Sequence, residues 1–128
     1  LEKFYLNAFQ SFLFNQWLAC RLDQANLYTG VAGDIWFTRE NCIAGPMFGE
    51  HLKSPNYEAA SIEQNLLQRY NLTDKSLSHP KIPGERRAAL LFAPDFSYDI
   101  LQDHLILRFF LRPGQYATSV LRELLKAQ

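Results

Sequence analysis

The aromatic and basic residues within positions 108–122 are the ones whose types and spacing point to chemistry. Tyr116 stands on a turn between an alternating apolar run and an amphipathic helix pattern. Its ring can therefore project from a sheet end and stack on a flipped-out base. Amide groups at the start of the next helix can meet a phosphate, and Arg108, Arg112 and Arg122 lie nearby in sequence. Turn aromatics more often pack against their own helix, and this alternative stays open for Tyr116.

The other titratable residues are scattered and form no recognisable catalytic or metal-binding pattern. The sequence contains no Gly-rich phosphate loop, HExxH, CxxC or GxSxG motif. The three histidines stand in unlike contexts, so we expect them on the surface or in loops and predict no metal site. We expect both cysteines to be reduced, buried thiols. These residues are His51, His79, His104, Cys20 and Cys42, and the scattered aspartates are Asp23, Asp34, Asp74, Asp95, Asp99 and Asp103.

The composition is that of a globular domain large enough to form a core. Hydrophobic residues make up 48% of the 128 residues and charged residues 20%, which is ordinary for such domains. The formal net charge of zero neither favours nor excludes nucleic-acid binding. Acidic residues dominate positions 2–63 and basic residues dominate positions 75–126, so a phosphate-facing surface is predicted in the second half. No apolar run reaches the roughly 18 residues of a membrane span, so no membrane partner is predicted.

Helical spacing of apolar residues predicts two helices in the first part of the chain. The first covers residues 4–24, where apolar residues including Leu13 and Trp17 recur at four-residue spacing. The second covers residues 54–70, because Ser54-Pro55 is typical of a helix start, and Asn71 can cap its end.

Strand patterns surround these helices, and the mixture predicts an α+β fold. A turn is predicted at residues 39–40, between the first two strands. Glycines and a proline predict a tight loop at residues 45–49, and residues 73–84 are predicted to be a linker or loop. Residues 117–126 are a predicted C-terminal helix. The predicted strands are residues 34–38, 41–44, 87–92, 96–101 and 105–111, and the end of a short helix is the alternative for residues 87–92.

Four segments of this sequence resemble the TruD-type tRNA pseudouridine synthase family. They occur in the family's order, with fitting gaps, and cover most of the chain; any one of them alone would be weak. They are FYLNAFQSFLFNQWLACRL (4–22), AGPMFGE (44–50), GERRAALLFAPDFSYDI (84–100) and LRPGQYATSVLRELL (111–125). Gln10 stands where the family usually has a basic residue, and the segment between residues 20 and 45 is shorter and less similar than expected.

The resemblance implies a fragment of an enzyme that converts a uridine in tRNA, expected to be uridine 13, into pseudouridine without a cofactor. Residues 1–91 would be part of the family's inserted domain, and residues 92–128 would supply the last strands and helix of the catalytic sheet. The implied partners are tRNA and the N-terminal part of the same enzyme, and the implied location is the cytoplasm. A non-catalytic RNA-binding module derived from this family, and a structural fragment with no RNA affinity, are the alternatives.

The resemblance also assigns roles to single residues. Tyr116 matches the aromatic residue that stacks on the target base, and Thr118 and Arg122 would shape the site beside it. The family's nucleophilic aspartate lies in a Gly-x-Lys-Asp motif that this sequence lacks. No catalytic residue is therefore assigned; the aspartate is expected upstream, and the chain alone is expected to be inactive. Arg86, Arg87 and Arg112 are candidate RNA contacts, with a structural ion pair as the equal alternative for Arg86 and Arg87. The edge of residues 105–111 is expected to be exposed.

Overall fold

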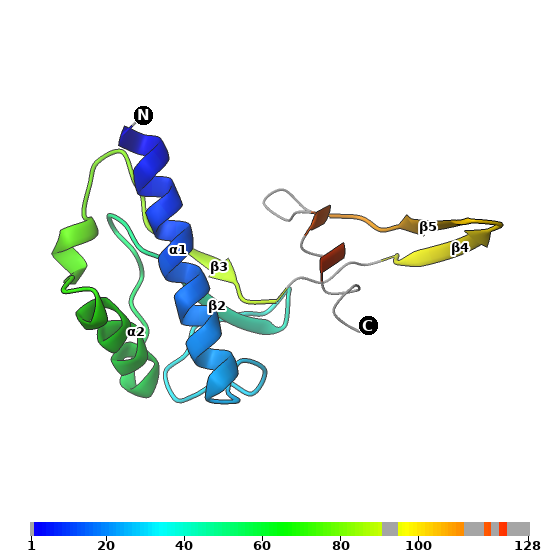
Figure 1. Cartoon of the computed structure of the whole chain (residues 1–128). Helices are drawn as coiled ribbons and strands as arrows, with labels where there is room; N and C mark the ends of the chain where they lie inside the picture. Colours follow the sequence, from blue (N-terminus) through cyan, green and yellow to red (C-terminus); the bar gives the residue numbers. More distant parts are fainter. Residues whose placement is uncertain (1, 91–94, 112–116, 119–120, 123–128) are drawn as a thin grey trace. The chain divides into compact units, whose positions relative to one another are not determined.

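The computed structural model describes residues 2–90, 95–111, 117–118 and 121–122 and divides the chain into two compact units, Leu1–Leu90 and Leu91–Gln128. Helices and antiparallel sheets occur together, which confirms the predicted α+β class (Figure 1). In the part of the chain that the structure describes, no helix is long and apolar enough to cross a membrane.

Helix α1 (Glu2–Asp23) is the long element of the first unit and agrees with the predicted helix to within two residues at each end. Leu13, Phe14 and Trp17 on its inner side are almost fully buried. They pack against the sheet, and α2 contributes further apolar residues to the same core. Burial of this face stabilises the helix because apolar side chains leave water.

Strand β2 (Cys42–Met47) is the centre of a three-stranded antiparallel sheet ordered β1-β2-β3. It pairs with the short β1 (Trp36–Phe37) and with β3 (Glu85–Ala88), and all six of its residues are buried. The turn predicted at residues 39–40 separates β1 from β2.

The prediction of a tight loop at residues 45–49 was wrong for its first half, because β2 continues through Met47. Pro46 is tolerated because the register with β1 ends at Ile43, so the edge of β2 beyond it needs no donor for β1. Gly45 is required by packing, since a Cβ atom there would lie 2.5 Å from the ring of Trp17. Gly45 therefore marks a close contact between α1 and β2, and Pro46 marks a part of β2 that is unpaired on the side of β1.

Helix α2 (Tyr57–Arg69) begins three residues later than predicted, with Asn56 as its N-cap. The amide of Asn56 donates a hydrogen bond of 3.1 Å to the carbonyl of Gly33, and Asn56 has extended backbone angles. Gly33 has no Cβ, and one would lie 1.8 Å from the carbonyl oxygen of Asn56. This tertiary contact, which the local sequence does not reveal, delays the start of the helix. Asn71 follows the C-cap in the left-handed conformation with φ of 57°.

The segment between α2 and the sheet is largely the predicted loop, but it contains the 3-10 helix η1 (Asp74–Leu77). Strand β3 begins two residues earlier than predicted and ends at Ala88 instead of residue 92. Its length follows from pairing, since Glu85 lies opposite Met47 and Ala88 lies opposite Ala44.

The second unit contains a β-hairpin of β4 (Ser97–Leu101) and β5 (His104–Arg108). β4 agrees with the predicted strand to within one residue, whereas β5 ends three residues before the predicted end. Every residue of β4 is exposed, and Ile100 and Leu105, which lie opposite each other, are 72% and 61% exposed. Four residues of the predicted C-terminal helix have helical backbone, namely 117, 118, 121 and 122. The rest of that prediction lies outside the described residues.

Candidate functional site

The turn that should carry the base-stacking aromatic is only partly described. Tyr116 and Arg112 lie outside the described residues, so their placement stays a prediction. Thr118 and Arg122 have helical backbone and are exposed.

Arg86 occupies a nearly buried site between β3 and α2. Its Nη1 atom lies 2.5 Å from Oε1 of Glu63, and the two side chains are 7% and 10% exposed. Nε of Arg86 also donates to the carbonyl of Lys53 at 2.8 Å. The ion-pair alternative considered for Arg86 is therefore present in the fold, and it leaves this guanidinium with little surface to offer a phosphate.

Burial also affects the proton equilibrium of Glu63. Loss of water around the carboxyl group raises its pKa above the ordinary value, and the hydrogen bond and charge of Arg86 partly oppose that shift. The charges of Asp34 and Asp74 act in the same direction as burial.

Arg87, the neighbouring candidate, has a different environment because successive strand residues point to opposite faces. Its guanidinium lies 5.5 Å from the ring centre of Phe14, and its side chain is 40% exposed. Glu85 is 3.8 Å away and also exposed, so this pair contributes little to stability. Arg87 thus retains an accessible charge.

On the hairpin of the second unit, Arg108 forms an ion pair with Asp99 on the neighbouring strand. Both side chains are more than half exposed. The pair compensates the charge of Arg108 within the hairpin. One of the basic residues in the second half of the chain, Arg108, therefore has its charge balanced by a neighbouring aspartate.

A buried polar cluster in the first unit was missed by sequence reasoning. Arg21 is fully buried and contacts Asp34 through Nη1 at 2.8 Å and Nη2 at 2.6 Å. Its Nη2 also donates to the carbonyl of Asn26 at 3.1 Å, and the guanidinium lies 5.2 Å from the Trp17 ring centre. The four-residue spacing of Leu13, Trp17 and Arg21 is a signal that this arginine lies on the buried face.

Gln10 is a second buried polar residue of α1. Its side-chain amide donates to the carbonyl of Phe48 at 2.6 Å and lies 3.5 Å from the carbonyl of Pro83. The side chain thus joins α1 to the loop after β2 and to the segment before β3. Gln10 has a structural function at the position where the resemblance led us to expect a basic residue.

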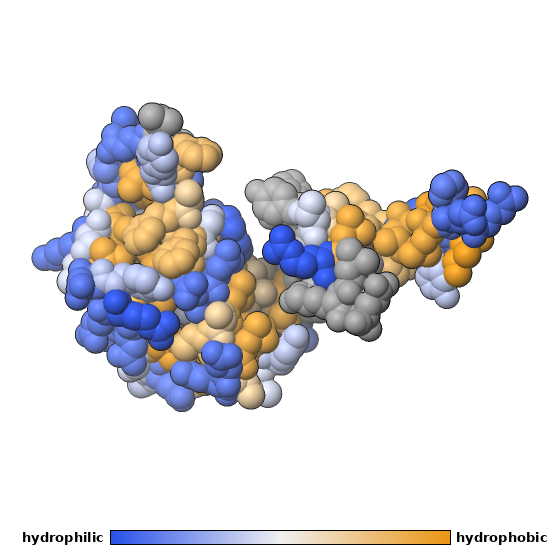
Figure 2. Space-filling model, in the orientation of Figure 1, coloured by the Kyte–Doolittle hydropathy of each residue, from blue (hydrophilic) through white to orange (hydrophobic). Residues whose placement is uncertain are grey.

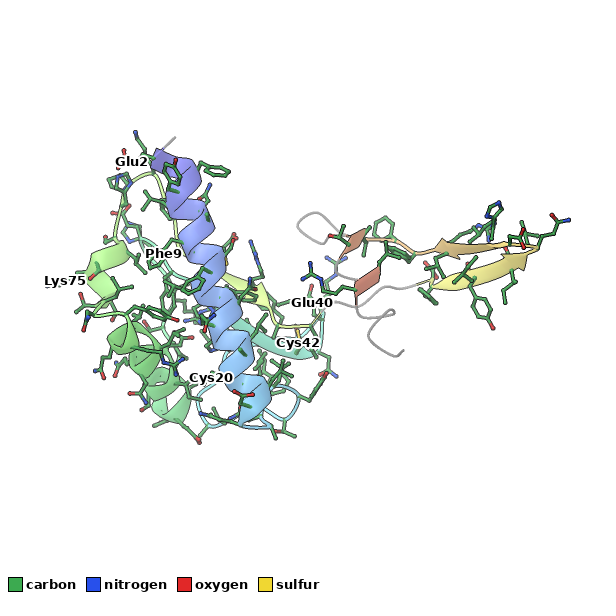
Figure 3. The ribbon with its side chains drawn as sticks, viewed as in Figure 1. Glu2, Phe9, Cys20, Glu40, Cys42 and Lys75 are labelled. Carbon is green, nitrogen blue, oxygen red and sulfur yellow. The ribbon has the colours of Figure 1, made fainter. Side chains whose placement is uncertain are left out.

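The described residues bring together no group of three or more His, Cys, Asp and Glu side chains that could hold a metal ion. Figure 3 shows Cys20 toward the end of α1 and Cys42 at the start of β2. Neither cysteine forms a disulfide; Cys42 is buried as predicted, and Cys20 is partly buried.

The fold is shared with a solved structure. The crystal structure of the putative tRNA pseudouridine synthase D (TruD) from Methanosarcina mazei superimposes with a TM-score of 0.73 at 22% identity, covering 97% of this chain and 38% of that chain. This likeness shows that the two proteins have the same fold over the matched region.

Sequence comparisons identify the family. The family model described as tRNA pseudouridine synthase D (TruD) matches residues 38–124. The tRNA pseudouridine synthase D of Anaeromyxobacter sp. (strain Fw109-5) is 35% identical over 99% of this chain and 43% of its own length. A tRNA pseudouridine synthase D of Thermus thermophilus is 30% identical over 100% of this chain and 41% of its length. The chain belongs to the TruD family of tRNA pseudouridine synthases, and it spans less than half the length of these relatives.

Proposed function

We propose that this chain is part of an enzyme that isomerises a uridine in tRNA, uridine 13, to pseudouridine. In that reaction the bond between C1′ of the ribose and N1 of uracil breaks, and a bond between C1′ and C5 forms. The atoms of the nucleotide are conserved, so the reaction needs no external oxidant or reductant and no cofactor is proposed. The observation that carries the proposal is the match of residues 38–124 to the TruD family model.

Residues 1–91 are proposed to belong to the inserted domain of the family and residues 92–128 to its catalytic domain. The division of the chain into compact units at Leu90 supports this boundary. The sequence has no Gly-x-Lys-Asp motif, so the nucleophilic aspartate is proposed to come from an N-terminal part of the same enzyme. The proposed partners are that part and tRNA, and the proposed location is the cytoplasm.

Tyr116 is proposed to stack on the target uracil while the glycosidic bond is cut. Tyr116 stands in the LRPGQYATSVLRELL segment. Thr118 and Arg122, which follow it in the sequence, have helical backbone and are exposed. Stacking of one base on an aromatic ring contributes about 1–3 kcal/mol. Thr118 and Arg122 are proposed to shape the same site, with Arg112 as a phosphate contact; Arg87, in the first unit, is proposed separately as an RNA contact.

The test compares Tyr116→Ala and Tyr116→Phe in the full-length enzyme, with pseudouridine in a tRNA transcript measured by mass spectrometry. Removal of the ring is expected to lower turnover by about 5- to 150-fold, which is the rate equivalent of the stacking energy. Tyr116→Phe keeps the ring and should retain most activity. Tyr28→Ala is the control, because Tyr28 is 70% exposed in the first unit. Unchanged turnover in Tyr116→Ala would show that this tyrosine is only a packing residue.

The alternative of a non-catalytic RNA-binding module is favoured by one observation, the missing Gly-x-Lys-Asp motif. The alternative requires that the full-length protein also lacks the motif and binds tRNA without modifying it. Pseudouridine formation by the full-length protein excludes this alternative. Salt-dependent tRNA binding without pseudouridine would support it, because phosphate contacts weaken as salt rises.

A further inference from the structure

The outer face of α1 carries a row of exposed residues that the first unit covers only in part, since the ring of Phe12 contacts that of Tyr70 at 5.5 Å and still remains 41% exposed. Alternating spacings of three and four residues place them along one side of the helix. The row, called here the outer seam, consists of Tyr5, Ala8, Phe12, Asn15, Ala19 and Leu22, all of them exposed.

The outer seam is apolar although it faces water. Tyr5 is 62% exposed, Phe12 41% and Leu22 55%. The opposite side of α1 is already buried against the sheet through Leu13 and Trp17, so the helix is apolar on both sides. Figure 2 shows apolar side chains on the side of α1 that faces the viewer. A helix that is hydrophobic all round is normally buried all round.

The spacing of the outer seam indicates what covers it. Alternating intervals of three and four residues are those of a helix that packs against another helix. Large and small residues alternate at Tyr5, Ala8 and Phe12, which creates knobs and holes for a facing helix. A single polar residue, Asn15, interrupts the seam, and one polar position of this kind can set the register of a helix pair.

The chemistry of the outer seam distinguishes protein from RNA as its partner. None of the six side chains carries a charge, whereas RNA binding depends on cations that meet phosphates. Aromatic residues combined with a lack of charge are typical of the core of a protein interface. The relatives extend well beyond the matched region, since this chain corresponds to 43% of the Anaeromyxobacter synthase. Such a length leaves ample polypeptide to supply a helix.

We propose that the outer seam of α1 packs against an apolar helix from the part of the synthase that lies outside these 128 residues. The inference rests on the proposed function, because it needs that part to exist. It assigns α1 a second role, with its inner side forming the core of the first unit and its outer side joining that unit to the rest of the enzyme.

The test is the reactivity of single introduced cysteines toward a maleimide. Ala8→Cys and Ala19→Cys probe the two ends of the outer seam, and both replace small exposed residues, so the fold is retained. Gln68→Cys is the matched control, since Gln68 is an exposed residue on helix α2. Labelling rates are measured by peptide mass spectrometry, which separates the new cysteines from Cys20 and Cys42, in the 128-residue chain and in the full-length synthase.

We expect Ala8→Cys and Ala19→Cys to react at least tenfold more slowly in the full-length synthase than in the 128-residue chain, and Gln68→Cys to react equally in both. Equal rates at the seam in the two proteins would overturn the proposal. Slow labelling already in the 128-residue chain would also overturn it, because another part of this chain or a second copy would then cover the seam. Protection that appears only when tRNA is added would assign the seam to RNA and overturn it as well.

Pseudouridine formation is measured on the same full-length protein, so the two proposals fail separately. Protected seam cysteines in a protein that cannot modify tRNA would refute the proposed function and leave the helix contact standing. Reactive seam cysteines in an active enzyme would refute the helix contact alone.

Discussion

Removal of the carboxylate of Asp34 should destabilise the first unit strongly, because it leaves the charge of Arg21 buried without its counter-ion. The two side chains are 4% and 0% exposed and lie 2.6 Å apart. Asp34 accepts two hydrogen bonds from the Arg21 guanidinium and a third, at 2.7 Å, from the amide of Val31. Loss of this carboxylate therefore affects both α1 and the loop that leads to β1.

The magnitude follows from the burial. Breaking a buried ion pair by removing one partner costs about 3–5 kcal/mol, whereas a typical domain has about 5–15 kcal/mol of stability in total. Asp34→Ala is therefore expected to lose about a fifth or more of the free energy of unfolding. For a unit of this size, a loss of about 3 kcal/mol lowers Tm by at least about 12 °C.

The assay is urea unfolding followed by far-UV circular dichroism, which reports on α1 and α2. Glu85→Gln is the control, because it removes an exposed partner of Arg87 and should change stability by less than about 1 kcal/mol. The double variant Arg21→Met/Asp34→Leu should be more stable than Asp34→Ala, since no unpaired charge remains. A loss below about 1 kcal/mol in Asp34→Ala would refute the reasoning, because water would then have to reach Arg21.

Three further outcomes are expected. Gly45→Ala should lower the stability of the first unit by about 1–3 kcal/mol in the same urea assay, because the new Cβ would lie 2.5 Å from the ring of Trp17; an unchanged midpoint would mean that α1 can shift away. Burial raises the folded-state pKa of Glu63, so the folded protein binds this proton more tightly than the unfolded protein does. The stability of the wild type relative to Glu63→Gln should therefore fall as pH rises above 4.5, the ordinary pKa of a glutamate. Unfolding midpoints from pH 4 to pH 8 test this, and a relative stability that rises with pH would contradict it. The isolated chain should self-associate through its hairpin, and Ile100→Thr/Leu105→Thr should reduce the association measured by sedimentation, because both residues are largely exposed; a monodisperse wild-type chain would contradict this.

Apolar periodicity predicted the elements that depend on local sequence. Helix α1 and strand β4 were located almost to the residue, because their patterns extend over several turns or pairs. The element ends that depend on tertiary contacts were missed. The start of α2 is set by the contact between Gly33 and Asn56, and the end of β3 is set by its pairing with β2.

The candidate site was predicted by a different route. The resemblance of the segment at 111–125 singled out Tyr116, Thr118 and Arg122. Of these, the structure describes Thr118 and Arg122, which have helical backbone and are exposed. For Arg86 the sequence left an ion pair and a phosphate contact open, because the partner Glu63 lies far away in sequence and the pairing exists only in the folded chain.

Glycine and proline in the segment 45–49 illustrate why a local signal can mislead. Both residues are typical of turns, yet here both lie within β2, Gly45 because of packing and Pro46 because that edge of the strand needs no donor for β1. Gly45 gives room to Trp17, which is the same side chain that the guanidinium of Arg21 covers. Two contacts therefore hold the inner side of α1 in place. The ring of Trp17 packs against the backbone of Gly45, and the buried Arg21 is paired with Asp34. The inner side of α1 is thus committed to the core of the first unit, which leaves the exposed outer seam for the proposed helix contact.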